Sequence, residues 1–381
     1  MTSAAITSET RSAPNYDFLF LLLSIAAAAV LSALVLLDGH PLSSALILGG
    51  FGLGAAFLKF EFSYTASWRR FLARGEASGL IGGLIVIAVA ALIIVPVAAL
   101  APGYGGAIAP IGPSLIIGAF TFGIGMQLAN GCGSGTLYTA GGGSGRMLIT
   151  LAFFIVGSVF GSLSLPAFLR LGGIDPVLAA DYLGPWGGLV LTLGTIAAVA
   201  AVIAFIARKR GANFVPSRGY VVGGIVIGVL CVGVFLAGGH PWSVTFGYTV
   251  WGGKLASLMG FDLTQAEFWT WEGPKRALRD SVLSDTSSLT DFGMIFGAMA
   301  MAAASKPFAR TAWPPVKSLL AAALGGLIMG WGARIGFGCN IGAFIGGVAS
   351  GSLHGWIWFV MALGGSLIGI RLRPLFGLSK D

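Results

Sequence analysis

The sequence predicts an all-α integral membrane protein with about nine transmembrane helices, re-entrant or broken half-helices, and two inverted repeats. Hydrophobic residues make up 56% of the 381 residues and charged residues only 9%, far below the roughly 25% typical of soluble domains. Long apolar stretches follow one another along the chain, and two of them run into a glycine-rich motif that contains a cysteine. Because glycine readily leaves the helical conformation, these motifs predict breaks within the membrane.

The predicted spans are apolar stretches close to the length of about 20 residues that a helix needs to cross hydrocarbon. They lie at 17–37, 78–100, 113–131, 147–169, 187–207, 219–238, 291–304, 318–337 and 355–370. Two of them are short, so the count is nine give or take one. Residues 1–16 are polar and precede a full-length span without a small-residue cleavage pattern, and no removable signal peptide is expected.

The net charge of +8 predicts membrane orientation rather than nucleic-acid binding, because the basic residues sit in short loops. Segments 68–75, 207–218 and 371–380 are basic and are expected in the cytoplasm, whereas loop 101–113 is uncharged and is expected outside. The predicted location is a membrane, with the lipid bilayer as the surrounding partner.

Two internal similarities indicate a duplication. The segment around Cys339 aligns without a gap on the segment around Cys132, and "FGYTVWGGK" (246–254) aligns on "FSYTASWRR" (62–70) in the same order. The predicted organisation is a polar tail at 1–16, a first repeat at 17–170, a linking segment with one helix at 171–218, a second repeat at 219–371, and a tail at 372–381.

The linking helix predicts that the second repeat is inserted upside down, because each repeat is expected to cross an even number of times. The basic loop 306–317 is expected inside, while its counterpart 101–113 is expected outside, as an inverted pair requires. An odd total number of crossings then places the N-terminus outside and the C-terminus in the cytoplasm.

The breaks at "GCGSGT" and "GCNIGA" predict a binding site, because irregular backbone persists at membrane depth only where it is buried in protein or lines a polar cavity. Freed amide groups and the start of the resuming helix favour an anion. The candidate pathway residues are Gly131, Cys132, Gly133, Ser134, Thr136, Gly338, Cys339 and Asn340 at the breaks, with Tyr64, Thr65, Tyr248 and Thr249 from the second pairing and Arg334 as the cation.

The charged residues also favour an anion. Of 14 Asp and Glu residues, only Glu61 falls in a segment expected to enter the membrane, so a proton or sodium relay is poorly supported. Arg334 lies inside a predicted span, five residues before Cys339. Three cysteines without CxxC spacing predict neither a disulfide framework nor a metal site, and no cofactor is expected.

The motifs "GIGMQLANGCGSGTLYTAGGGS", "GWGARIGFGCNIGAFIGGVASGS" and "GGHPWSVTFGYTVWGGKLAS" resemble the YeeE/YedE family of bacterial inner-membrane proteins. The resemblance covers nearly the whole chain. It implies uptake of thiosulfate or a related small sulfur anion, with Cys132 and Cys339 as the motif cysteines. Family members often carry a further cysteine in the early re-entrant segment, where this chain has Ser63.

Several alternatives stay open. A membrane-embedded sulfurtransferase or thiol redox enzyme is the second function class, although the chain has no CxxC motif to support it. Cys231 is expected to be a packing residue. A cytoplasmic sulfur-carrier protein is a further candidate partner. Loop 259–290 is either a structural flap or a partner contact, and Arg334 either serves the anion or reaches a membrane interface.

Overall fold

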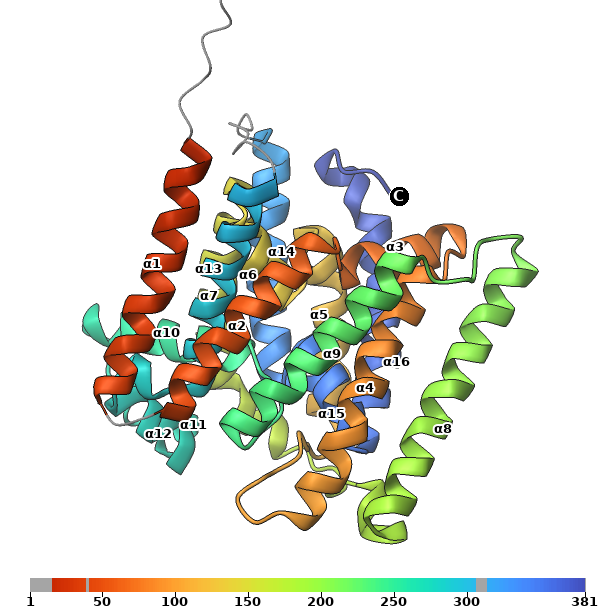
Figure 1. The fold of residues 1–381 in the computed structure, drawn as a ribbon, viewed down its shortest axis with the longest axis horizontal. Helices are drawn as coiled ribbons and strands as arrows, with labels where there is room; N and C mark the ends of the chain where they lie inside the picture. Colours follow the sequence, from red (N-terminus) through yellow and green to blue (C-terminus); the bar gives the residue numbers. More distant parts are fainter. Residues whose placement is uncertain (1–15, 39–40, 306–313, 381) are drawn as a thin grey trace, which may run out of the picture.

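The computed structural model describes residues 16–38, 41–305 and 314–380, and this part of the chain is helical with ten candidate membrane spans. The helices lie roughly side by side, and shorter helices stand at the two ends (Figure 1). The elements are α1 (Tyr16–Leu37), α2 (Pro41–Lys59), α3 (Tyr64–Arg74), α4 (Ser78–Leu100), α5 (Pro113–Ala129), α6 (Gly133–Gly141), α7 (Gly145–Leu169), α8 (Ala179–Lys209), α9 (Arg218–Gly238), α10 (Thr245–Leu258), α11 (Glu267–Thr270), α12 (Glu272–Arg279), η1 (Val282–Ser284), α13 (Thr286–Ser305), α14 (Val316–Ile335), the π-helix η2 (Asn340–Ile345), α15 (Gly346–Ala349), α16 (Leu353–Leu372) and η3 (Arg373–Phe376).

Nine of the spans match the sequence prediction in position, and the tenth is α2, which the prediction missed. Its four glycines lower its apparent hydrophobicity, yet all four lie in close contact with α13 or α9. A Cβ atom added at Gly54 would lie 2.0 Å from the Met294 carbonyl oxygen. The glycines of α2 therefore serve close helix packing rather than a loop.

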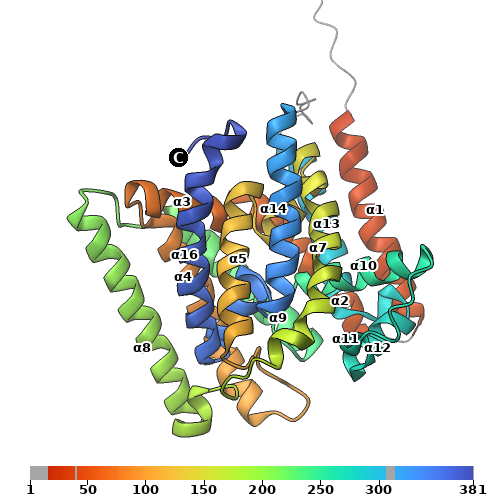
Figure 2. The same ribbon diagram turned by 180° about the vertical axis from the view of Figure 1, so that it is seen from behind.

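The tenth span corrects the expected topology. An even number of crossings returns the chain to its starting side, and Figures 1 and 2 show the start of α1 and the C-terminal end of the chain at the same end of the molecule. The expectation of an outside N-terminus and a cytoplasmic C-terminus assumed an odd number of crossings, because the prediction did not include α2. The predicted basic loop 306–317 and tail 1–16 fall largely outside the described residues.

Two sets of helices form the core. The spans α5, α7, α14 and α16 pack together on one side of the molecule, while α2, α4, α9 and α13 pack on the other. Glycines allow the closest approaches, and a Cβ atom added at Gly123 would stand 2.1 Å from the carbonyl oxygen of Ala362 in α16. In contrast, α8 lies at the edge beside α4 (Figure 2).

Four short helical segments do not qualify as separate spans: α3, α6, α10, and η2 with α15. The first of them begins at Ser63, whose hydroxyl accepts a hydrogen bond from the Ala66 N–H group at 3.2 Å. It ends at Gly75, which adopts the left-handed conformation with φ 79°. These short segments place helix ends in the interior of the protein, where the two glycine-cysteine motifs lie.

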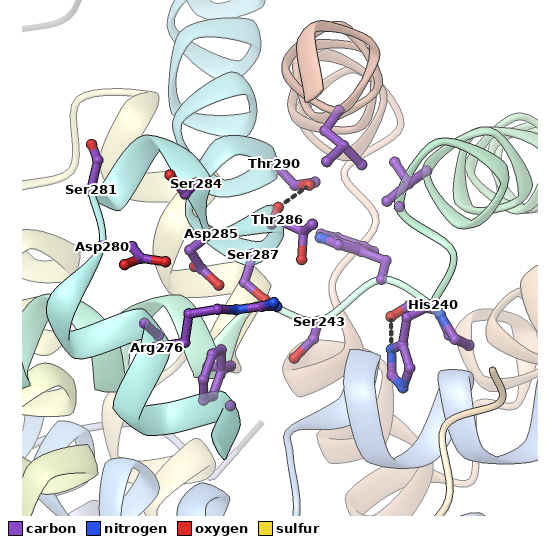
Figure 3. Close-up of a pocket in the computed structure, with 18 residues that line it drawn as sticks. His240, Ser243, Arg276, Asp280, Ser281, Ser284, Asp285, Thr286, Ser287 and Thr290 are labelled. Carbon is purple, nitrogen blue, oxygen red and sulfur yellow. Dashed lines mark hydrogen bonds between the residues drawn. The ribbon is translucent and has the colours of Figure 1, made fainter. Parts of the chain in front are cut away.

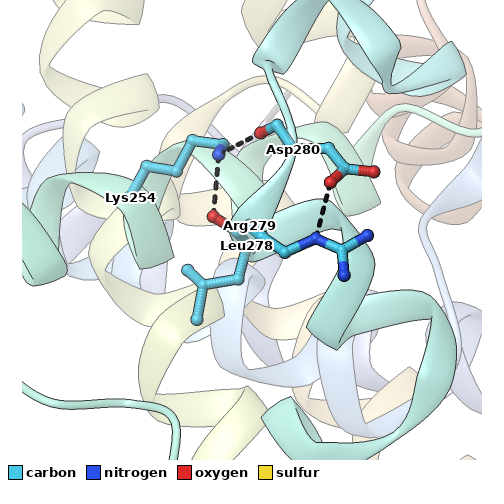
Figure 4. A network of polar contacts seen from close by, with 4 residues as sticks. All are labelled: Lys254, Leu278, Arg279 and Asp280. Atoms are coloured by element: carbon cyan, nitrogen blue, oxygen red, sulfur yellow. Dashed lines mark hydrogen bonds and ion pairs between the residues drawn. The ribbon is translucent and has the colours of Figure 1, made fainter.

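The segment 259–290 folds into α11, α12, η1 and the first turn of α13, at the end of the molecule opposite the C-terminus (Figure 1). Lys254 in α10 fixes it, because its Nζ atom donates to the carbonyl oxygens of Leu278 at 2.9 Å and Asp280 at 2.5 Å (Figure 4). The structure therefore shows a folded segment, called the flap below, that is held against α10; the predicted alternative of a partner contact stays a prediction.

Candidate functional site

The first glycine-cysteine motif joins α5 to α6 through a sharp change of direction. Asn130 ends α5 in the left-handed conformation with φ 64°, and Cys132 then caps α6. Its sulfur accepts a hydrogen bond from the Gly135 N–H group at 3.3 Å and lies 3.5 Å from the Ser134 hydroxyl. A thiol in place of the usual hydroxyl or carboxylate cap therefore points into the break.

The second motif breaks the chain between α14 and η2. Gly338 adopts φ 147°, a conformation that other residues rarely reach, and Cys339 follows at the cap position, fully buried. The N–H group of Phe344 donates to the Cys339 carbonyl oxygen at 3.4 Å, which is the spacing of a wide π-turn. Such turns occur frequently at functional sites.

The two breaks meet inside the protein. A Cβ atom added at Gly133 would lie 2.9 Å from the Cys339 sulfur, so this thiol rests against the backbone beside Cys132. Tyr248 of α10 donates a hydrogen bond to the Gly133 carbonyl oxygen at 3.0 Å. From the opposite side, Thr65 of α3 neighbours the Cys132 thiol. The structure thus brings together residues from four segments that the sequence analysis had paired.

Several buried polar atoms around the thiols have no hydrogen-bond partner among the described residues. They are the hydroxyls of Tyr64, Thr65 and Thr136 and both polar atoms of the Asn340 amide. Thr249 differs, because its hydroxyl donates to the Thr245 carbonyl oxygen within α10 at 3.0 Å. An unpartnered buried polar group costs free energy, and a cluster of them is what a polar ligand would satisfy.

An outer cavity of about 560 Å³ lies at the flap end. Its lining includes His240 and Ser243 before α10, Arg276 of α12 and Asp285 before α13, and Figure 3 shows the Arg276 side chain extending across it toward the start of α13. Ser243 connects this cavity with the second break, because its hydroxyl would stand 3.5 Å from a Cβ atom added at Gly342.

A second cavity, also of about 560 Å³, lies at the C-terminal end beside α3. Glu61 and Ser63 line it, as do Tyr138 and Thr139 of α6, whose first residue follows Cys132. Three arginines also line it, Arg69, Arg70 and Arg74, which makes the lining strongly positive.

Arginines also surround the C-terminal end of α5, just before Cys132. Arg69 donates to the Asn130 side-chain oxygen at 2.8 Å, and Arg373 donates to the same oxygen at 3.3 Å. Arg146 donates to the carbonyl oxygens of Leu128 and Ala129. Cations are favourable at this negative end of the helix dipole. The sequence analysis missed this cluster because its members lie far apart in the chain.

Arg334 occupies the last turn of α14, and its guanidinium group lies over the rings of Phe246 at 5.7 Å and Phe268 at 5.4 Å. Two of its nitrogen atoms, Nε and Nη1, have no hydrogen-bond partner in the described part of the chain. Because Phe246 lines the outer cavity, Arg334 stands behind the wall of that cavity. The structure places it there and shows no contact between Arg334 and the thiols.

Two acidic residues lie in surroundings that the sequence analysis did not expect. Asp291 was missed as a membrane carboxylate, although it is fully buried in the span α13, whereas Glu61 is exposed in the loop after α2. The Ser- and Thr-rich stretch before Asp291 forms the first turn of α13, so the span starts earlier than predicted. Cys231 packs in α9 beside the apolar side chains of Trp242 and Ile341.

The sequence is similar to those of known proteins. The sulphur transport family matches residues 60–368. The chain is 34% identical over 155 residues to the probable transporter YedE of Escherichia coli (strain K12), covering 40% of this chain and 37% of that relative. The YedE protein of Salmonella typhimurium gives the same values. The thiosulfate transporter TsuA of Spirochaeta thermophila is 30% identical over 264 residues, covering 64% of this chain and 72% of that protein.

The matched segment thus spans little more than a third of the length of the YedE relatives. The family match, in contrast, includes both glycine-cysteine breaks and most of the chain. It confirms the resemblance that the motifs indicated. The chain is a multi-pass membrane protein that belongs to the sulphur transport family.

Proposed function

We propose that the protein takes up thiosulfate, or a closely related small sulfur-containing anion, across the bacterial inner membrane. The observation that carries this proposal is the position of Cys132 and Cys339. Their breaks abut each other, and each neighbours residues that line one of two cavities at opposite ends of the molecule. The thiosulfate transporter among the relatives supports the choice of substrate.

The chemistry of the site suits transient binding. Thiols, hydroxyls and the Asn340 amide offer neutral hydrogen bonds, which are weaker than charge-assisted ones and therefore allow release. The nine-residue helix α6 begins at Gly133 and adds the positive end of its dipole. Arg334 contributes positive potential from behind the outer cavity without contacting the anion in the site.

Pairwise contacts support the proposal that the chain contains two inverted repeats, at 17–170 and 219–371. A Cβ atom added at Gly118 would lie 2.8 Å from the Gly332 carbonyl oxygen, and one added at Gly325 would lie 2.8 Å from that of Gly125. Each residue of the first contact is offset by 207 from its counterpart in the second, as are Cys132 and Cys339. A twofold axis between α5 and α14 would produce this exchange of partners, with α3, α6, α10 and η2 as re-entrant segments.

The distribution of charge supports a cytoplasmic location for the C-terminal end. Arg70 and Arg74 of α3, Arg210 after α8 and Arg373 after α16 lie at this end, and the Arg210 side chain reaches the Phe71 carbonyl oxygen of α3. The flap end carries most of the loop acids. By the preference of cytoplasmic loops for Lys and Arg, the flap faces outside and the start of α1 faces the cytoplasm.

A sulfurtransferase would need a thiolate within reach of a partner protein. Both thiols are buried, with exposed fractions of 2% for Cys132 and 0% for Cys339. Reactive cysteines sit in partially exposed, electropositive surroundings. The burial therefore favours transport. A sulfur-carrier protein that receives the anion in the cytoplasm remains a candidate partner of the arginine-lined cavity.

Uptake of labelled thiosulfate by proteoliposomes that contain only the purified protein tests the proposal. Replacing Cys132 or Cys339 with Ala should abolish uptake while leaving the protein folded, because Ala preserves most of the packing and removes the thiol. The matched control is Cys231→Ala, which should retain uptake. Undiminished uptake by the double Cys132→Ala, Cys339→Ala variant would overturn the proposed site, and absence of uptake by the wild type would overturn the substrate.

Serine variants separate two mechanisms at the same positions. A serine hydroxyl still donates a hydrogen bond but forms neither a persulfide nor a disulfide. We expect Cys132→Ser and Cys339→Ser to keep part of the uptake, since the proposed contact is a hydrogen bond. Complete loss in both variants, with folding intact, would instead support sulfur exchange or a requirement for the softer thiol.

A further inference from the structure

Asp291 is a carboxylate at membrane depth for which the anion pathway provides no role. Its side chain is fully buried in α13, and neither of its oxygen atoms has a hydrogen-bond partner in the part of the chain that the structure describes. An ionisable residue inside a span is costly, and such residues mark ion and proton pathways. Thiosulfate binding alone would be hindered by a negative charge here.

The carboxylate lies between the outer cavity and the second break. Ser287 and Thr290, one turn and one residue before Asp291 on the same helix, line the outer cavity. The Oδ2 atom rests against α10, because a Cβ atom added at Gly247 would stand 2.7 Å from it. Asp291 is also near enough to interact electrostatically with Tyr248 and Cys339.

The elements that pack against α13 bring no described cation to Asp291. Its ionisable neighbours are Tyr248 from α10, Cys339 from the second break and Asp285 from the start of α13. The backbone of α2 contacts α13 at Ile47 and Phe51, and α2 has no ionisable residue before Lys59 at its end. Between Phe18 and Leu37, α1 has no ionisable residue, and α6 contacts α13 at Gly141.

We propose that Asp291 binds the proton that is co-transported with the sulfur anion. This inference rests on the proposed anion transport and adds its driving force. An ionised Asp291 repels an anion at Cys339, whereas a protonated Asp291 does not. Proton and anion therefore bind with positive coupling, and by reciprocity each raises the affinity for the other. The proton enters from the outer cavity and leaves with the anion, and no covalent bond forms or breaks.

Co-transport of a proton also fits the charge of the cargo. A dianion that enters a cell with a negative interior moves against the membrane potential, and each accompanying proton removes one of its charges. Thr290 and Ser287 offer hydroxyls along the short route from the outer cavity to the carboxylate. The sequence analysis had disfavoured a proton relay because it counted only Glu61 as a membrane carboxylate.

Proteoliposomes with a trapped pH dye test the proposal. The membrane potential is clamped with potassium and valinomycin, an inward proton gradient is imposed, and thiosulfate is added outside. The wild-type protein should accumulate thiosulfate and acidify the interior at the same time. Asp291→Asn, which mimics the protonated side chain, should still exchange labelled for unlabelled thiosulfate but should lose accumulation and acidification by about tenfold or more.

Asp262→Asn is the matched control, because Asp262 is an exposed acid in the loop after α10, lies outside the lining of the outer cavity and should leave coupling unchanged. Thiosulfate exchange by the wild type without any acidification would overturn the proton proposal and leave the proposed function standing. Accumulation by Asp291→Asn that still depends on the proton gradient would also overturn the proton proposal and leave the proposed function standing. Absence of any exchange by the wild type would instead count against thiosulfate transport itself. The acidification assay uses the wild type alone, so it decides whether a proton is co-transported even if Asp291→Asn fails to fold.

Discussion

The two breaks occupy equivalent positions in the chain, yet they hold their thiols differently. Cys132 caps a regular α-helix and its sulfur accepts a hydrogen bond from Gly135, so the thiol is fixed in place. Cys339 begins a π-turn and makes no such cap bond. Its neighbour Asn340 keeps an unpartnered amide among the described residues, and Asp291 lies nearby. In the proposed transport, the first break is therefore preorganised, and the second is the one expected to adapt to the anion and the proton.

The strongest test of this comparison is at the contact between the two breaks. Gly133→Ala would place a methyl group 2.9 Å from the Cys339 sulfur and 3.2 Å from the Thr245 methyl group. Because displacement of a binding group by about 1 Å costs up to about 100-fold in rate, we expect uptake to fall by about that factor. Initial rates of labelled thiosulfate uptake, normalised to protein in the liposomes, measure the effect.

The control for this variant is Gly142→Ala, just after the end of the same helix. Its added Cβ atom would make only ordinary contacts, the nearest at 3.4 Å to the Tyr138 carbonyl oxygen. Uptake should stay near the wild-type rate. Equal rates for both alanine variants would mean that the breaks do not need to meet closely.

A second variant addresses the adaptable break alone. Asn340→Ala removes an amide that has no partner among the described residues, so the free energy of unfolding should stay the same or rise by about 1 kcal/mol. Uptake should nevertheless fall about fivefold, because the anion loses a hydrogen-bond donor worth about 1 kcal/mol. Thermal unfolding and uptake are measured on the same preparation.

A purely structural Asn340 would give the opposite pair of results. The Asn340→Ala protein would then be less stable, and the remaining folded fraction would transport at the normal rate. Such an outcome would remove the proposed difference between the breaks.

The cavities at the two ends allow a milder test. Arg276 lines the outer cavity, whereas its neighbour Lys275 is exposed and lies outside the lining. We expect Arg276→Gln to raise the KM for thiosulfate about threefold, since an exposed charge contributes less than about 1 kcal/mol. The increase should shrink at high salt. A similar increase for Lys275→Gln would show that the overall charge of the flap, rather than the cavity, attracts the anion.

The smallest effect on uptake is expected at the flap anchor. Lys254→Met removes the two hydrogen bonds to the Leu278 and Asp280 carbonyl oxygens, each worth about 1.5 kcal/mol for a charged donor. Hydrogen exchange in residues 272–284 should then become faster by about tenfold or more, while uptake changes less than about twofold. Unchanged exchange would mean that packing alone holds the flap closed.

Most of the fold could be predicted from the sequence because few backbone structures can cross the hydrocarbon core of a membrane. Nine helices match apolar stretches, and α4 matches its predicted range, 78–100, at both ends. The same reasoning missed α2, because glycines that pack against α13 look like loop residues in the sequence. One further candidate span changes the expected number of crossings from odd to even, so the proposed side of the N-terminus depends on each single crossing.

Part of the candidate site could be predicted because the glycine-cysteine motif occurs twice in the sequence. The gapless pairing of the segments around Cys132 and Cys339 indicated both breaks, as expected for a duplication. Asp291 has no counterpart in the proposed first repeat, where the residue 207 positions earlier is Leu84. A search for matched pairs therefore passes over it. The arginines around Asn130 come together only through long-range packing, which the sequence does not display.

The two cavities also have an electrical consequence. In the proposed pathway, solution that enters both cavities would leave a short dry stretch around the thiols, where low-dielectric walls focus the membrane field. A dianion accompanied by one proton would then cross nearly the whole voltage in this stretch with a net charge of −1, at a cost of about 2.3 kcal/mol per 100 mV. The rate of the step past Cys132 and Cys339 should therefore depend steeply on membrane voltage, as in a gate rather than a long pore.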